Sequence, residues 1–378
     1  MITRIEAKGY KCLADVAVDV GPLNVLVGPN ASGKSTLLDV LGFLHDALRR
    51  DWDADRALRK RARHLEELLW RGRPRSFSVA LTAARARLGE APTYAGDPER
   101  LTYAAEVGIG PDGALGVLCE RLEAPGCGLP PLERGPAGLF TGPPPAPGWP
   151  VLAVRAEAQD LALSAVDTWL RDLLRDRVHF VQLDPVAMRK RCPPDAPREF
   201  QPDGSNLPFL VQQLHKQAPD RFAWWLDHLR TVLEGLQDIE VREQPDDRHL
   251  FLVASFANGL QVPSWLLSDG TLRFLALTLI AYLPTDDHIY VIEEPENGIH
   301  PKALEALMDS LKSVYEGQVF IATHSPLIVD LVELDELLCF SLDANGATQI
   351  VRGSEHPWLQ DWHREVPLSR YFAAGVLG

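Results

Sequence analysis

The sequence predicts an α/β protein with a largely parallel central sheet, and three observations support this fold class. An apolar run at residues 23–27 is followed by a glycine-rich turn and a helical pattern. A second run, at residues 289–292, ends in two glutamates, and a third, at residues 318–322, ends in Thr-His-Ser-Pro. Short continuous apolar runs are typical of strands buried on both faces. Polar side chains at the carboxyl ends of such strands usually line a ligand site.

The glycine-rich turn has the spacing of a phosphate-binding P-loop. Residues 28–35 read G-x-x-x-x-G-K-S, and leucines then recur at helical spacing to about residue 50. Glycines let backbone N–H groups turn toward a phosphate, and the helix N-terminus adds positive potential. An ordinary glycine-rich turn is the alternative. The predicted nucleotide contacts are Gly28, Pro29, Asn30, Ala31, Ser32, Gly33, Lys34, Ser35 and Thr36. Lys34 is expected to reach the β- and γ-phosphates of ATP, and Ser35 to ligate Mg²⁺.

The two glutamates after the second strand are candidates for the chemistry of hydrolysis. Glu293 is expected to hold Mg²⁺ through water, and Glu294 to polarise the attacking water as a general base. Helix capping or surface charge is the alternative for such a pair. Pro301 suits the first position of a helix over residues 302–316, which Gly317 is expected to end.

His324 follows the third strand. A histidine at this strand end can sense a γ-phosphate and hold the attacking water, although a structural histidine is the alternative. Its place one strand–helix–strand step after Glu294 favours the site role. The predicted catalytic residues are therefore Glu294, His324 and Lys34.

A second turn, Ser268-Asp269-Gly270, lies 23 residues ahead of Glu293 and opens a helix expected at residues 271–283. Gly270 permits close backbone approach, and the helix N-terminus favours a phosphate. A capping turn is the alternative. Asp269 is unusual beside a triphosphate, so its carboxylate is expected to point away or to bond its own backbone.

Taken together, these segments resemble the ABC-type ATPases of the SMC/RecF/OLD group, often described as AAA-family ATPases. The resembling segments are residues 9–13, 28–35, 203–207, 267–273, 293–301 and 323–326. The resemblance implies an α/β ABC-ATPase head (a P-loop NTPase) with an antiparallel β-subdomain and a helical insertion. It also implies a head-to-tail dimer with two ATPs at the interface. The P-loop, Glu293, Glu294 and His324 would come from one subunit, and Ser268 and Gly270 from the other.

Two departures from the family pattern affect the expected function. Asp269 and Thr271 replace residues of the usual L-S-G-G-Q signature, which favours the OLD and RecF-like side of the group over membrane transporters. The γ-phosphate-sensing glutamine has no clear match. Gln182, at the end of a strand-like run at residues 178–183, is one candidate, and a plain strand residue is the alternative.

The chain divides into four expected segments. Residues 1–123 form an N-terminal ATPase lobe with strands near 77–82, 101–108 and 114–122, preceded by a charged helical stretch at 51–75. Residues 124–150, with nine Pro and six Gly, form a loop. Residues 151–265 form a helical lobe with helices at 152–177 and 206–236, and residues 266–378 form the C-terminal ATPase lobe. The 54 residues after His324 are too few for the nuclease domain that some family members carry, so any nuclease is expected on another polypeptide.

Composition limits the partners. The chain has no membrane-length apolar stretch, no signal-peptide pattern and no C-x-x-C pair among its five cysteines, so a reduced cytoplasm is expected. The net charge of −14 disfavours a globally basic nucleic-acid binder. Arg71, Arg73 and Arg75 alternate, so an extended segment would place them on one face toward DNA phosphates; a solvated surface is the alternative.

The expected function is therefore an ATPase that forms a homodimer or higher oligomer around ATP and controls a separate effector, such as a nuclease or toxin, or DNA. Anti-phage defence or DNA repair is expected by analogy with the family. One alternative is a nucleotide-dependent scaffold with negligible turnover. Another, less favoured by the signature, is the ATP-binding subunit of a transporter.

Overall fold

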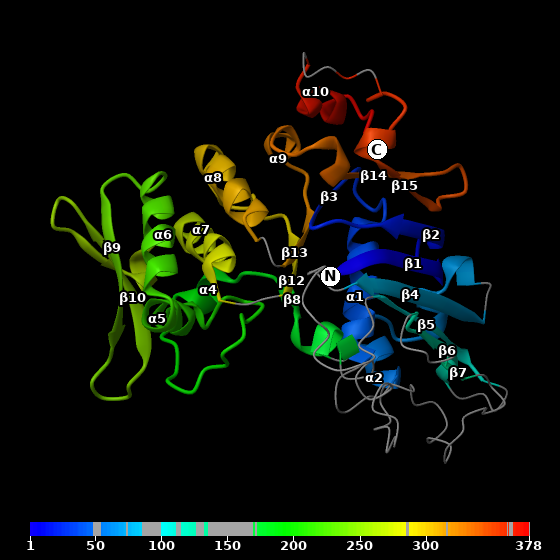
Figure 1. Cartoon of the computed structure of the whole chain (residues 1–378), viewed down its shortest axis with the longest axis horizontal. Helices are drawn as coiled ribbons and strands as arrows, with labels where there is room; N and C mark the ends of the chain where they lie inside the picture. The colour runs from blue at the N-terminus through cyan, green and yellow to red at the C-terminus, as the bar shows by residue number, and fades with distance from the viewer. Residues whose placement is uncertain are drawn as a thin grey trace.

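The structure is a computed structural model that describes most of the chain. The described residues are 1–47, 54–72, 75–84, 100–110, 115–125, 132–134, 169–170, 172–284, 287–314, 317–360, 362 and 366–377. Within them the strands form a six-stranded antiparallel sheet, a six-stranded mixed sheet and a three-stranded sheet. Figure 1 shows the antiparallel sheet on one side of the mixed sheet and most of the helices on the other.

The mixed sheet is the centre of the fold and has the order β15-β14-β3-β13-β12-β8. Its neighbours pair in parallel except β15, which is antiparallel to β14. Successive side chains of each strand enter different cores: Val25 and Val27 pack on the helical side, and Leu26 packs on the other. Because both faces are covered, the strands read as continuous apolar runs, and the predicted parallel sheet is confirmed. The strands are β3 (Leu23–Val27), β8 (Val178–Val181), β12 (Ile289–Glu293), β13 (Gln318–Ala322), β14 (Leu337–Leu342) and β15 (Thr348–Arg352).

Helix α1 (Lys34–Ala47) lies between the mixed sheet and the antiparallel sheet. Leu37, Leu41 and Phe43 are among its fully buried side chains, and they join the two sheets into one core. The predicted strands near residues 77–82, 101–108 and 114–122 all belong to the antiparallel sheet. In sheet order its strands are β2 (Leu13–Asp19), β1 (Ile2–Tyr10), β4 (Ser76–Ala84), β5 (Arg100–Ile109), β6 (Leu115–Glu123) and β7 (Leu132–Arg134).

A buried glutamine ties the two six-stranded sheets together at one corner. The amide of Gln318 accepts from the Ile2 backbone N–H at 3.0 Å and donates to the Ile2 carbonyl at 2.8 Å. The same Nε2 donates to the Gly21 carbonyl at 2.7 Å. The first strand of the chain is thereby joined to β13, more than 300 residues later.

The other face of the mixed sheet is covered by helices α4 to α9. Trp225 of α6 is fully buried and donates its indole N–H to Thr278 of α7 at 3.0 Å. The lobe expected to be helical also contains the three-stranded sheet β11-β10-β9. The elements on this side are α4 (Pro185–Met188), α5 (Leu207–Gln217), α6 (Pro219–Arg230), β9 (Leu236–Glu243), β10 (Leu250–Phe256), β11 (Gln261–Pro263), α7 (Asp269–Leu279), α8 (Pro301–Lys312) and α9 (Pro326–Asp330).

Some helical predictions differ from the structure. The stretch at 51–75 is not one helix: its described part holds α2 (Ala54–Arg59) and two short 3₁₀ turns, Leu65–Leu68 and Trp70–Gly72. Helix α8 already ends at Lys312, and Gly317 has a packing role, because a Cβ there would lie 2.7 Å from the His288 carbonyl oxygen. Most of the helix expected at 152–177 and of the loop at 124–150 lies outside the described residues. The remaining short elements are a π-helical turn, Asp172–Asp176, the 3₁₀ turns Ser264–Leu266, Ile280–Tyr282, Leu334–Glu336 and Gly353–Glu355, and α10 (Leu368–Ala373).

No helix in the described part of the chain is both long enough and apolar enough to span a bilayer.

Candidate functional site

The P-loop joins β3 to α1 and takes a backbone path that requires its two glycines. Gly28 and Gly33 have φ values of 143° and 107°, at which any residue with a Cβ has a strained backbone. A Cβ at Gly28 would lie 2.3 Å from the Phe340 carbonyl oxygen, and one at Gly33 would lie 2.3 Å from Thr348 Oγ1. The glycines therefore provide both the turn and the close packing of the loop against β14 and β15.

Lys34, the first residue of α1, is turned into its own loop. Its Nζ donates to the carbonyls of Gly28 at 2.7 Å and Pro29 at 2.9 Å. Burial lowers the pKa of Lys34, and the neighbouring carboxylates of Glu294 and Glu293 oppose that shift. The ammonium thus lies over the loop, between its carbonyls and the acidic end of β12.

Ser35 and Glu293 meet although they are 258 residues apart in the sequence. The Ser35 hydroxyl donates to Glu293 Oε2 at 2.6 Å. A hydroxyl and a carboxylate are hard oxygen ligands, and Mg²⁺ commonly takes one or two of these and completes its shell with water and phosphate oxygens. The pair therefore fits the predicted Mg²⁺ site.

A cavity of about 540 Å³ opens over the P-loop. It brings together most of the predicted site residues, and it also includes Lys11 and Cys12 of the β1–β2 turn, to which the sequence analysis gave no role. Lys11 Nζ donates to Asp39 of α1 at 2.7 Å. The full lining is Lys11, Cys12, Asn30, Ala31, Ser32, Gly33, Lys34, Ser35, Thr36, Glu293, Glu294, Ala322 and His324.

Glu294 follows β12 in a strained conformation. Its φ of 48° is uncommon for a residue with a side chain, and its backbone N–H donates to the Ala322 carbonyl of β13 at 2.7 Å. The Asn297 side-chain amide donates to the Glu294 carboxylate. Backbone and side chain are both held by neighbours, so the carboxylate faces the cavity in a fixed place.

His324 is held by a residue that the sequence analysis did not single out. Glu296 Oε1 accepts from the Thr323 hydroxyl at 2.7 Å and from the His324 backbone N–H at 3.0 Å. Glu296 Oε2 is buried without a hydrogen-bond partner among the described residues. The only sequence signal for Glu296 was its place two residues after Glu294. Its partner His324 lies 28 residues further along the chain, and no local pattern predicts that contact.

Gln182, the candidate phosphate-sensing glutamine, lies at the end of β8 beside a second cavity of about 520 Å³. Ser35 and Glu293 line both cavities, so Gln182 faces the same side of the site as the predicted Mg²⁺ ligands. Its backbone N–H donates at 2.8 Å to the carbonyl of Pro202, the residue just before the resembling segment at residues 203–207.

The turn at residues 268–270 is not part of either cavity lining. Ser268 caps α7, with its Oγ accepting from the Thr271 backbone N–H at 3.1 Å, and both Ser268 and Asp269 are exposed. Figure 1 shows α7 and α1 on opposite sides of β12 and β13. Within one subunit, therefore, the predicted signature residues do not meet the P-loop.

Asp269 and Gly270 have partners in the same subunit. The Arg189 guanidinium donates to the Asp269 carboxylate, so of the two expected arrangements the structure does not show the one in which this carboxylate bonds its own backbone. A Cβ on Gly270 would lie 2.1 Å from the Gly298 carbonyl oxygen. The glycine is required for α7 to pack on the loop that carries Glu294 and Glu296.

These features define a P-loop NTPase with an ABC-type head: a P-loop helix, paired acidic residues at the end of β12, a histidine after β13, and a separate Ser-x-Gly helix start. Residues 185–330 match the family described as "AAA domain, putative AbiEii toxin, Type IV TA system". Residues 1–67 match the family described as "AAA ATPase domain".

Solved structures with a similar fold include SMC heads. One, an SMC head bound to the C-winged helix domain of ScpA, has a TM-score of 0.58 at 16% identity and covers 93% of this chain and 97% of its own. Another, with an extended coiled coil and bound to the C-terminal domain of ScpA derived from Pyrococcus furiosus, has a TM-score of 0.56 at 13% identity and covers 99% and 98%.

A curated relative, the OLD nuclease of Thermus scotoductus, is 42% identical over 53 residues, which are 13% of this chain and only 10% of that protein. These partial matches and the fold fit an SMC/OLD-like ATPase, the group that the resemblance in the motifs predicted.

Proposed function

We propose that this chain binds ATP with Mg²⁺ over the P-loop and hydrolyses it. The observation that carries the proposal is the convergence of Ser35, Glu293, Glu294 and His324 on one cavity at the P-loop. Water attacks the γ-phosphorus in line, and ADP leaves. Lys34 balances the charge of the transferring phosphoryl group, and Ser35 and Glu293 would hold Mg²⁺, which would supply further positive charge there. Glu294 orients the water, and His324 senses the γ-phosphate and helps to hold the water.

The proposed active form is a head-to-tail dimer. Ser268, Asp269 and Gly270 lie outside the cavity lining of their own subunit, yet they form an exposed helix start of the kind that binds phosphates. A second copy would bring this turn over the nucleotide, so that each of two sites is shared between subunits. Closed two-fold pairing of this kind is common among homo-oligomers.

Three variants test the proposal by ATP turnover and by molar mass in light scattering. Glu294→Gln should keep ATP binding, lose turnover and accumulate as a dimer with ATP. Lys34→Ala should lose ATP binding, and Ser268→Arg should bind ATP but stay monomeric. Unchanged turnover in Glu294→Gln would remove the general-base assignment. A normal ATP-driven dimer in Ser268→Arg would remove the shared site.

The cycle would control a separate effector protein in the cytoplasm, in anti-phage defence or DNA repair. Three kinds of relative support a partner: the family described with a toxin–antitoxin system, the OLD nuclease, and the SMC heads bound to ScpA domains. A reading frame for a nuclease or toxin beside this one would support the effector role, whereas repair genes would favour repair. A non-hydrolysing scaffold is the competing function, and wild-type turnover decides between them.

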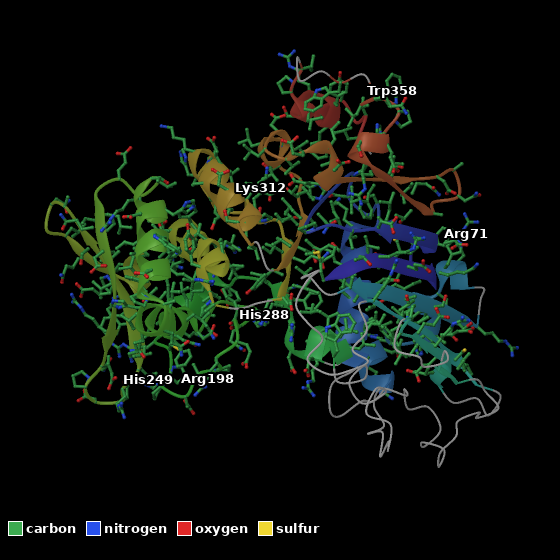
Figure 2. The ribbon with its side chains drawn as sticks, in the orientation of Figure 1. Arg71, Arg198, His249, His288, Lys312 and Trp358 are labelled. Carbon is green, nitrogen blue, oxygen red and sulfur yellow. The ribbon has the colours of Figure 1, made fainter. Side chains whose placement is uncertain are left out.

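DNA stays a candidate partner, but without the argument from alternating arginines. Arg71 has a φ of 54° inside a 3₁₀ turn, so it does not lie on an extended segment with Arg75, and Arg73 lies outside the described residues. Arg71 instead stacks on Trp70 and donates to the Asn345 carbonyl at the edge of the molecule (Figure 2). Its contacts have a structural role.

A further inference from the structure

Arg189 holds both neighbours of Ser268. The residue follows α4 directly, and its Nη2 donates to the Leu267 carbonyl at 2.8 Å and to the Asp269 carboxylate. The Arg189 side chain is 29% exposed and the Asp269 side chain 60%. A partly exposed guanidinium is therefore bonded to the residues on both sides of Ser268, at the start of α7.

The negative charge of Asp269 at this turn must be balanced by a cation if a triphosphate is to bind there. The Asp269 carboxylate alone would repel a triphosphate approaching Ser268, because like charges at a few ångströms oppose each other strongly once water is excluded. Arg189 balances that charge. Among the described residues both hydrogen bonds of its side chain come from Nη2, and a guanidinium carries five N–H donors in a planar fork that suits phosphate oxygens.

We propose that Arg189 contacts the phosphates of the ATP held by the partner subunit, with Asp269 and the Leu267 carbonyl as the clamp that orients it. The proposal rests on the head-to-tail dimer proposed above. In this proposal Arg189, which lies 79 residues before Ser268 in the sequence, is the cation that contacts the nucleotide in the shared site. It also explains why an aspartate is tolerated in the signature turn: the carboxylate positions the arginine.

Mixing two variants tests whether Arg189 acts across subunits. Arg189→Ala should lose at least about tenfold in ATP turnover, as expected when an arginine that stabilises phosphoryl transfer is removed. A mixture with Lys34→Ala should recover turnover, up to about half of the wild-type value per mixed dimer, because each mixed dimer has one intact site of two. In that site the Arg189→Ala subunit supplies the P-loop, and the Lys34→Ala subunit supplies Arg189.

A parallel mixture of Lys34→Ala with Ser268→Arg separates the two proposals. Recovery there, without recovery in the Arg189→Ala mixture, overturns the role of Arg189 and leaves the shared site standing. Recovery in neither mixture overturns the shared site, and the role of Arg189 with it. Recovery in both supports both.

A double variant distinguishes a direct contact of Arg189 with the phosphates from mere neutralisation of the Asp269 charge. If Arg189 only covers Asp269, then Arg189→Ala combined with Asp269→Asn should return to wild-type turnover, and that result overturns the proposal. We expect turnover to stay low. Arg191→Ala is the matched control, since Arg191 stacks on Trp265 at 5.5 Å and has no assigned role in turnover. If Arg189→Ala fails to fold, judged by circular dichroism, Arg189→Gln replaces it, because it keeps a polar side chain and removes the guanidinium.

Discussion

The side chains around Glu294 and His324 form one connected set. Glu296 bonds Thr323 and the backbone at His324, while Thr323 Oγ1 accepts from the Ser325 N–H at 2.9 Å. Two turns, one after β12 and one after β13, are thus held by a single carboxylate. A misplacement of a catalytic group by about 1 Å can lower catalysis about 100-fold. Glu296 can therefore affect turnover by positioning its neighbours, although it does not line the cavity over the P-loop itself.

Replacing Glu296 should separate positioning from binding. Glu296→Ala removes the acceptor for Thr323 and His324, so we expect kcat to fall about tenfold with KM for ATP nearly unchanged. Glu296→Gln keeps an oxygen at that place and should retain most turnover. Steady-state kinetics on both variants measure this. Equal losses in the two variants, or a loss seen mainly in KM, would contradict the assignment.

The sequence predicted candidate site residues where they belong to short motifs with fixed spacing. The P-loop, Glu293, Glu294 and His324 line one cavity because each lies at the end of a buried strand of one sheet, and parallel strands end at the same edge. The Arg189–Asp269 ion pair could not be predicted in this way. It joins residues 80 apart in the chain, and neither belongs to a pattern that specifies the other.

Among helices and strands, burial decided what could be predicted. Strands of the mixed sheet read clearly because both faces are covered. No strand was predicted at β9, because its buried side chains Leu236 and Ile239 are three residues apart and lack the alternation typical of a strand. The stretch at 51–75 has many charges but breaks into short turns, since Leu65 and Leu68 pack under the β1–β2 turn, where Lys11 N–H bonds the Leu68 carbonyl at 2.7 Å.

The contact between α7 and the loop after β12 gives a test at Gly270. In an ordinary helix Gly→Ala stabilises by about 1 kcal/mol. Here the added Cβ meets the Gly298 carbonyl oxygen, so we expect Gly270→Ala to destabilise by about 1–3 kcal/mol, the usual cost of overpacking. Denaturant unfolding measures the change. Gly21→Ala is the control, because a Cβ there would meet only the Leu23 carbonyl at 4.0 Å. A stabilised Gly270→Ala would show that the loop moves aside freely.

The whole chain carries a net charge of −14, and this charge bears on assembly. Two copies repel each other, and two bound nucleotides add further negative charge. Specific contacts such as the one proposed for Arg189 act over a few ångströms, whereas net-charge repulsion acts over the Debye length, about 10 Å at 0.1 M salt and about 30 Å at 0.01 M. Moderate salt should therefore weaken the repulsion more than the contacts.

We accordingly expect the ATP-bound Glu294→Gln dimer to tighten as ionic strength rises from about 0.01 M to 0.1 M. Any DNA binding should respond in the opposite way, because each phosphate contact releases counterions and loses affinity as salt increases. Sedimentation of the dimer, and of the dimer with a DNA duplex, across the same salt series measures both. A dimer that weakens with salt would mean that interface ion pairs outweigh the net charge. If salt left the affinity of an ATP-dependent DNA complex unchanged, recognition of DNA phosphates would be contradicted. Protein partners would then be the expected targets of the ATP cycle.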